Sequence, residues 1–187
     1  MDYTESYMNL SHGTDAESAE KILENGFKKN GDCHSWCGSG VYFYDIKAKA
    51  WWSANRTCSI KNKNALKKLK AKVIFADIIN ISREHVFDMR VNKDLELFEK
   101  FFSEMFNDFS LQIPNTHDEL EKKIILRSIM ISFFSDRMNR KLVIGNFKQS
   151  PRSEHVKMIN FADSLDMVFG IETIYCIKDI TVLSNIH

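Results

Sequence analysis

The stretch from residue 10 to residue 45 constrains the fold of this chain more than any other part of its sequence. It reads as a strand that ends in a His-Gly-Thr triplet at 12–14, a helix, a polar glycine-containing loop and a second strand over 41–44. The two strands would bring polar or aromatic groups to one cleft, His12 from the first and Tyr42 from the second. This arrangement is more typical of a nucleotide pocket than of a structural hairpin.

The helix inside this stretch has signals at both ends. Thr14 or Asp15 is expected to cap its start, and Thr14 and Glu17 have the spacing of a capping box. Gly26 follows the last periodic residue, where a glycine at the C-terminal cap is favoured. Between them runs an apolar stripe of Ala16, Ala19, Ile22 and Leu23.

The rest of the chain predicts a mixture of helices and strands. Apolar spacing predicts helices over about 46–56, 95–109 and 120–138, and strands over 7–10, 73–79, 142–144 and within 169–183. The 187 residues contain 44% hydrophobic residues, which is enough to bury one core. No internal repeat or low-complexity linker divides the sequence, so we expect a single α+β domain over residues 1–187.

Charge and cysteine content narrow the class of protein. The formal net charge is +1, so any contact with nucleic acid would have to be local. The first eleven residues do not resemble an apolar signal segment, and no run of eighteen apolar residues is present. We therefore expect a cytoplasmic protein without a membrane segment, in which Cys33, Cys37, Cys58 and Cys176 are reduced thiols.

Two local patterns leave alternatives open. The basic run at 61–72 is either a solvated face or a patch that contacts phosphates or an acidic partner, through Lys67, Lys68, Lys70 and Lys72. The pattern Cys33-His34-x-x-Cys37 offers metal ligands, but no second pair follows at the spacing of a zinc site, so no metal is expected.

The residues of the first stretch have a chemistry of their own. A glycine after a histidine leaves the backbone N–H and C=O of Gly13 open to a planar amide. Tyr42 on the facing strand offers an aromatic platform, and a carboxylate on a third strand would stabilise a positive ribosyl centre. Each residue is ordinary by itself, and only their order and spacing together favour a site.

These motifs resemble those of ADP-ribosyltransferases of the diphtheria-toxin and poly(ADP-ribose)-polymerase (His-Tyr-Glu) type. That pattern is His-Gly-Thr/Ser, a helix that ends in Gly-Phe, and Gly-x-Gly-[Val/Ile]-Tyr-Phe, which matches HGTDAESAEKILENGF at 12–27 and GSGVYFYD at 38–45. Residues 73–89 and 169–183 also resemble the middle and last strands of bacterial members. The resemblance implies two small packed antiparallel sheets that form an NAD cleft, with flanking helices.

The resemblance also implies a role for each motif residue. His12 would hold the ribose hydroxyls of the adenosine half of NAD, and the backbone of Gly13 would clamp the nicotinamide carboxamide. Tyr42 would stack on the nicotinamide ring. The other residues that it places in the site are Thr14 and, as the aromatic that closes the sandwich, Trp51 or Trp52.

The last strand departs from the family pattern. An alignment without a gap on 177–179 places Ile174 where members carry the catalytic glutamate. Glu172 lies two residues earlier and so on the same face of a strand. We expect a bulge or a one-residue register change to bring Glu172 to the ribose. The alternative is that Ile174 occupies the catalytic place.

The expected function is transfer of ADP-ribose from NAD, the co-substrate, to a protein or nucleic acid inside a cell. The resemblance makes the chain an enzyme of the glycosyltransferase class and a monomeric bacterial toxin of a toxin–antitoxin or phage-defence system, whose partners would include a neutralising antitoxin. Two alternatives remain: an NAD glycohydrolase with water as acceptor, and a non-catalytic module that binds ADP-ribose or a partner.

Overall fold

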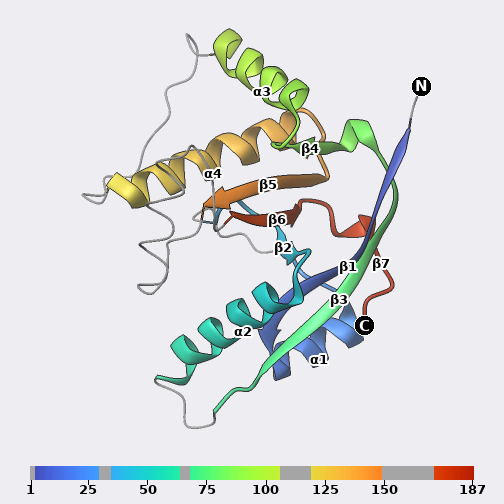
Figure 1. Cartoon of the computed structure of the whole chain (residues 1–187), viewed down its shortest axis with the longest axis vertical. Helices are drawn as coiled ribbons and strands as arrows, with labels where there is room; N and C mark the ends of the chain where they lie inside the picture. The colour runs from blue at the N-terminus through green and yellow to red at the C-terminus, as the bar shows by residue number, and fades with distance from the viewer. Residues whose placement is uncertain (1–2, 30–34, 64–67, 106–118, 149–170) are drawn as a thin grey trace.

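The structure, a computed structural model, describes residues 3–29, 35–63, 68–105, 119–148 and 171–187 (Figure 1). In these residues seven strands form one mixed sheet in the order β4-β5-β6-β2-β1-β3-β7, and only β4 and β5 are parallel. The strands are β1 (Thr4–Asp15), β2 (Val41–Tyr44), β3 (Ala71–Ser82), β4 (Val86–Asp88), β5 (Leu142–Lys148), β6 (Ile171–Ile177) and β7 (Leu183–Ser184). The helices are α1 (Ala16–Asn25), α2 (Lys47–Asn62), α3 (Asn92–Met105) and α4 (Glu119–Arg137), with short 3-10 turns at Arg83–His85 and Ile180–Val182.

The predicted α+β class is confirmed, and each predicted helix is present, although α2 extends six residues beyond its expected end at about residue 56. Of the two predicted caps, Asp15 and not Thr14 caps α1, so the alternative of a capping box that starts at Thr14 is wrong. The Asp15 Oδ1 accepts the Ser18 backbone N–H at 2.9 Å. At the other end Gly26 has a φ of 76°, and its N–H donates to the Ile22 carbonyl, as the sequence predicted.

The sheet is nearly divided between β1 and β2. β1 pairs with β3 over most of its length, and β2 pairs with β6 at every residue. Between β1 and β2, however, Ser11 and Tyr44 form the one recorded pair. The expected two separate sheets are therefore not confirmed; the described strands form two halves that this pair connects.

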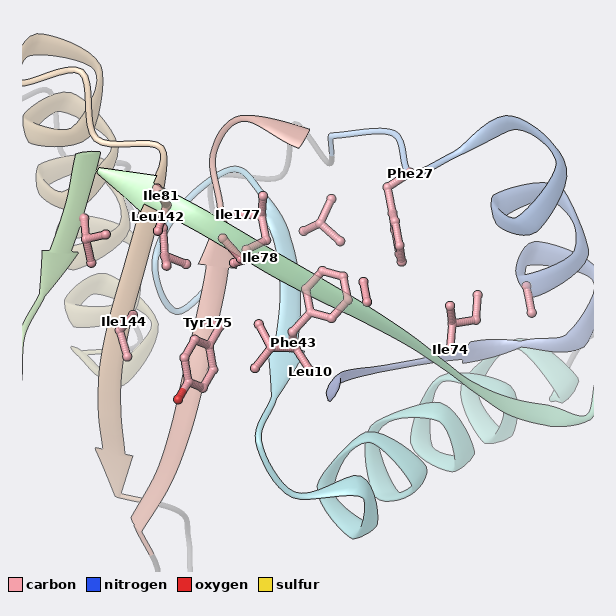
Figure 2. Close-up of a cluster of buried hydrophobic side chains, with 14 residues drawn as sticks. Leu10, Phe27, Phe43, Ile74, Ile78, Ile81, Leu142, Ile144, Tyr175 and Ile177 are labelled. Carbon is pink, nitrogen blue, oxygen red and sulfur yellow. The ribbon is translucent and has the colours of Figure 1, made fainter. Parts of the chain in front are cut away.

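Strand alternation separates two apolar cores, one on each face of the sheet. The core on the α1 face contains Leu10, Phe43, Ile74 and Tyr175, and Phe27 from the segment after α1 packs against it (Figure 2). The opposite face carries a second core in which β5 and β6 contact Phe102 of α3 and Ile131 and Phe134 of α4. Tyr42 and Tyr44 belong to this second face.

Helix α2 covers the β1–β3 half of the second face. Its buried residues, Ala50, Ala54 and Cys58, recur every four positions and form one narrow stripe. Figure 1 shows α2 beside β1 and β3, whereas α3 and α4 lie at the β4–β5 end of the sheet. Three residues of the sequence predictions, Cys33, His34 and Lys67, lie outside the described residues.

Candidate functional site

The place where β1 and β2 separate carries the histidine of the His-Gly-Thr motif. The Nδ1 atom of His12 lies 2.8 Å from the Tyr42 carbonyl oxygen. Because a carbonyl can only accept, Nδ1 carries the proton, which leaves Nε2 as an acceptor. Burial lowers the pKa of His12, and the bond to the Tyr42 carbonyl only partly offsets this. The imidazole is therefore neutral near pH 7.

His12 lines a cavity of about 390 Å³ on the α1 face. Its ring makes edge contacts with Phe27, at 5.2 Å between centroids, and lies 5.5 Å from Phe43. The wall of the cavity combines Phe27 with Lys21 and Lys28, which supply positive charge. The remaining lining residues are Ser18, Ile22, Asn25, Gly26, Gly40, Val41 and Tyr42. A pocket with an aromatic wall, a neutral hydrogen-bond acceptor and two cations can hold a nucleoside with phosphates.

The backbone of Gly13 points into the gap between β1 and β2. Phe75 exchanges two backbone hydrogen bonds with His187, so its N–H and C=O point away from β1. Ser11 is the partner of Phe75, so its own backbone groups point away from β3 and towards β2, where it pairs with Tyr44. Gly13 lies two residues after Ser11, so its N–H and C=O also point away from β3 and towards β2. At Gly13, however, the β1–β2 ladder has already ended.

A glycine at position 13 also allows α2 to approach β1. A Cβ atom there would lie 1.9 Å from the Ala50 carbonyl oxygen and 3.0 Å from the Ala54 nitrogen. The sequence analysis explained Gly13 by the access that it gives a ligand to the backbone. In the structure the side-chain direction of Gly13 faces the helix backbone, and only the strand edge is open.

Tyr42 is held by the loop that precedes β2. Its hydroxyl donates to the Gly38 carbonyl and accepts the Cys37 N–H at 3.0 Å. Burial raises the pKa of this hydroxyl, so it stays protonated. The buried Lys178 holds the same loop, since its Nζ donates to the carbonyls of Cys37 and, at 2.8 Å, Ser39. These bonds fix the Tyr42 ring on the face opposite to the His12 imidazole.

Glu172 lies on the same face as Tyr42 and Tyr44. Its carboxylate forms an ion pair with Lys49 of α2 at 2.7 Å, and its side chain is only 6% exposed. Burial raises the pKa of Tyr44, and the negative charge of Glu172 raises it further. A hydrogen bond with Ser53 and the charge of Arg56 oppose this rise. The structure therefore brings Glu172, Tyr44 and three residues of α2 together.

The bulge predicted for the last strand is absent. β6 pairs with β5 in unbroken register over all seven of its residues, including Phe147 with Glu172. Strand alternation alone places Glu172 on the Tyr42 face, two residues from Ile174. Ile174 is 1% exposed, pairs with Tyr44 and belongs to the second core. Glu172 was predicted to face the same cleft as His12 and Tyr42. It lies on the Tyr42 face of the sheet, whereas the His12 side chain lies on the other face with Phe27.

The two tryptophans of α2 are exposed and differ in position. Trp52 lies three residues after Lys49 and four before Arg56, and the Arg56 guanidinium lies 5.5 Å from its ring. Trp51 lies about 160° around the helix from Lys49, nearer to Lys47, whose ammonium is over Phe75 of β3. Of the two, Trp52 is the one beside the Glu172 cluster. Thr14 is half-buried on the His12 face and pairs with Lys72.

Sequence reasoning missed Lys49 and Ser53, which contact Glu172 and Tyr44. A signal for them was present, because Lys49, Trp52, Ser53 and Arg56 share one side of α2 at helical spacing. The strand that this side would face could not be named without the order of the sheet.

Comparisons with known proteins do not name a function. A protein of Methanocaldococcus jannaschii, described as uncharacterized, is 39% identical over 94 residues. The match covers 44% of this chain and 42% of that protein, so the chain spans less than half the length of this relative. No protein-family model matches the chain, and no solved structure matches it significantly. The family expected from the sequence motifs stays a prediction.

No helix in the described part of the chain is long and apolar enough to cross a lipid bilayer. Within the described ranges, no group of three or more His, Cys, Asp or Glu side chains is arranged to hold a metal ion.

Proposed function

We propose that this protein is an NAD-dependent ADP-ribosyltransferase that acts on a macromolecular acceptor. The observation that carries the proposal is the gap between β1 and β2. The His12 pocket lies on one face of the sheet beside this gap, and the Glu172–Lys49 pair, from β6 and α2, lies on the other face. NAD would place its adenosine half on the first side and its reacting ribose towards the second.

The His12 pocket supports binding of the adenosine half. A neutral imidazole with Nε2 as acceptor can take a hydrogen bond from a ribose hydroxyl. The Phe27 ring offers an apolar wall to the adenine. Lys21 and Lys28 line the same cavity, and their positive charge would attract the diphosphate of NAD.

The strand edge at Gly13 supports binding of the nicotinamide amide. Its N–H and C=O point into the gap, and a carboxamide has one acceptor and one donor that complement such a pair. The Tyr42 carbonyl, which an extended β1–β2 ladder would have used, instead accepts from His12. The imidazole thereby ends the ladder and keeps the Gly13 edge available.

Glu172 supports the chemical step. Cleavage of the nicotinamide–ribose bond builds up positive charge on the ribose, as in glycoside hydrolysis. An ionised carboxylate in a site with little water stabilises that charge more strongly than it would in solution. The ammonium of Lys49, 2.7 Å from Glu172 Oε1, orients the carboxylate. Because Ile174 is buried in the core, we infer that Glu172 is the catalytic carboxylate. We therefore favour an enzyme over a non-catalytic binding module.

The same argument extends to the fold and the biological role. We infer a fold of the ADP-ribosyltransferase type, because two half-sheets that meet at one residue pair leave a gap for NAD. We also propose an intracellular toxin or phage-defence factor with a neutralising antitoxin. That role rests on the motif resemblance of the sequence and on no single residue of the site.

Labelled NAD tests the proposal. The chain is incubated with NAD labelled in the adenylate phosphate in three separate mixtures, which contain purified protein, RNA or single-stranded DNA as the acceptor. We expect label to join one of these acceptors. Label only in free ADP-ribose would identify a glycohydrolase, and unchanged NAD in every mixture would overturn both enzymes.

A pair of variants connects the activity to the site. Glu172→Gln should keep NAD binding and reduce cleavage by about 10²–10³-fold, because the lost interaction is strongest in the transition state. Glu99→Gln removes an exposed carboxylate from α3 and should retain cleavage. Equal activity of the two variants would contradict the assignment of Glu172.

A further inference from the structure

One side of α2 presents two exposed indoles in a basic setting. We define the α2 stripe as the exposed residues Trp51, Trp52, Asn55, Arg56, Ser59, Ile60 and Lys63, which recur at helical spacing. Trp51 is 40% exposed and Trp52 is 44% exposed, although indoles are usually covered. The two indoles lie at one end of the stripe, and most of its other residues are polar or cationic, so the stripe does not resemble an apolar protein interface.

The charge of this surface has one sign. α2 contains four basic residues and no acidic one. Lys49 and Lys61 are bound to the carboxylates of Glu172 and Asp15, whereas Arg56 lies on the stripe over Trp52. The exposed cations Lys63, Lys68 and Lys70 continue beyond the end of the helix.

We propose that the α2 stripe binds single-stranded nucleic acid and that this strand is the acceptor of ADP-ribose. The second part rests on the proposed function. Bases of any sequence can stack on an indole, and a neighbouring line of cations follows the phosphates. Trp52 lies one helical turn from Lys49, whose ammonium contacts Glu172, so a base stacked there would lie near the carboxylate that would act on the ribose of NAD.

The length of the stripe suits this ligand. Lys63 lies eleven positions after Trp52, which is about 16 Å along a helix. At a rise of about 3.4 Å per stacked nucleotide, this distance corresponds to roughly four or five nucleotides. The stacking side chains lie at one end of that distance, and the cations Lys63, Lys68 and Lys70 lie at the other.

Fluorescence titration tests binding without NAD. A mixed-sequence single-stranded RNA or DNA of twenty nucleotides should quench the emission of Trp51 and Trp52. Trp36 provides a constant background, because it is partly buried with the Arg127 guanidinium 4.9 Å from its ring. Four cations on the phosphates predict a slope of log affinity against log salt of about −2.8, a fall of about 50-fold between 50 and 200 mM.

Variants assign the binding to the stripe. Trp52→Ala should weaken binding by about 5- to 150-fold, and Trp52→Phe by much less, because a phenyl ring still stacks. Arg56→Gln with Lys63→Gln should reduce the salt slope to about −1.4. The control Leu23→Ala removes an equally exposed apolar residue from α1, and Lys93→Gln with Lys100→Gln removes equal charge from α3.

Several results would overturn the proposal: no quenching of the wild type at 50 mM salt, equal loss in the control variants, or equally tight binding of duplex. Quenching by poly-glutamate but not by nucleic acid would assign the stripe to an acidic protein instead. Because the titration contains no NAD, its failure would leave the transferase proposal intact. Binding of nucleic acid without any cleavage of NAD would contradict the transferase proposal and leave the binding proposal intact.

Discussion

Replacement of Lys49 by methionine should destabilise the protein through the carboxylate that it leaves behind. Methionine keeps most of the aliphatic stem of the lysine and removes the ammonium that lies 2.7 Å from Glu172 Oε1. Glu172 is then an ionised group with a 6% exposed side chain and without its cation. A buried charge that loses its partner pays a desolvation cost that no remaining interaction offsets.

The size of the effect follows from the unequal burial of the two partners. Exposed ion pairs contribute about 0.2–1 kcal/mol, and breaking a fully buried pair costs about 3–5 kcal/mol. Glu172 belongs to the buried class, but the Lys49 side chain is 34% exposed, so water can partly replace it. We expect a loss of about 2 kcal/mol in the free energy of unfolding, which lowers the melting temperature by roughly 4–8 °C in a chain of this size.

A double-mutant cycle measures this coupling. Glu172→Gln alone should cost about 1 kcal/mol or less, because the remaining Lys49 can be solvated. In that background Lys49→Met should cost almost nothing, so the coupling free energy is about 2 kcal/mol. Denaturant unfolding of the four proteins at pH 7 gives these values. An equal cost of Lys49→Met with and without Glu172 would refute the reasoning.

Three further predictions concern the gap and its borders. Gly13→Ala should lower the free energy of unfolding by about 3 kcal/mol or more, because the added Cβ would overlap the Ala50 carbonyl. Gly26→Ala should lower it by only about 1–2 kcal/mol, because Gly26 has a φ of 76° but open space around it. Thermal unfolding of the two variants measures this difference. Tyr42→Phe removes a hydroxyl with two loop partners and should cost about 1–2 kcal/mol in the same assay; no loss would mean that the loop does not depend on it. Burial lowers the pKa of His12 in the folded protein, so the unfolded chain binds a proton at His12 more readily. The stability of the folded protein that is present above about pH 6.5 is therefore lost as the pH falls below this value. His12→Asn should remove this part of the pH dependence of unfolding.

The sequence by itself determined the local elements. The apolar spacing of α1, its glycine at position 26 and the alternating strand over 41–44 are short-range signals, and all three appear where they were expected. They can be read from sequence because helix periodicity and the backbone freedom of glycine act within a few residues. The same period of two placed Glu172 and Ile174 on one face before any partner strand was known.

Only the tertiary structure decided what these faces meet. The order β6-β2-β1 puts Ile174 beside Tyr44, and the packing of α2 on β1 brings Lys49 to Glu172. The alternation of a strand says which side chains share a face, but it contains no information about the neighbouring strand or the covering helix. Register between strands far apart in sequence is set by long-range contacts of the whole core. The face on which Glu172 lies could therefore be predicted from the sequence, but its ion pair with Lys49 could not.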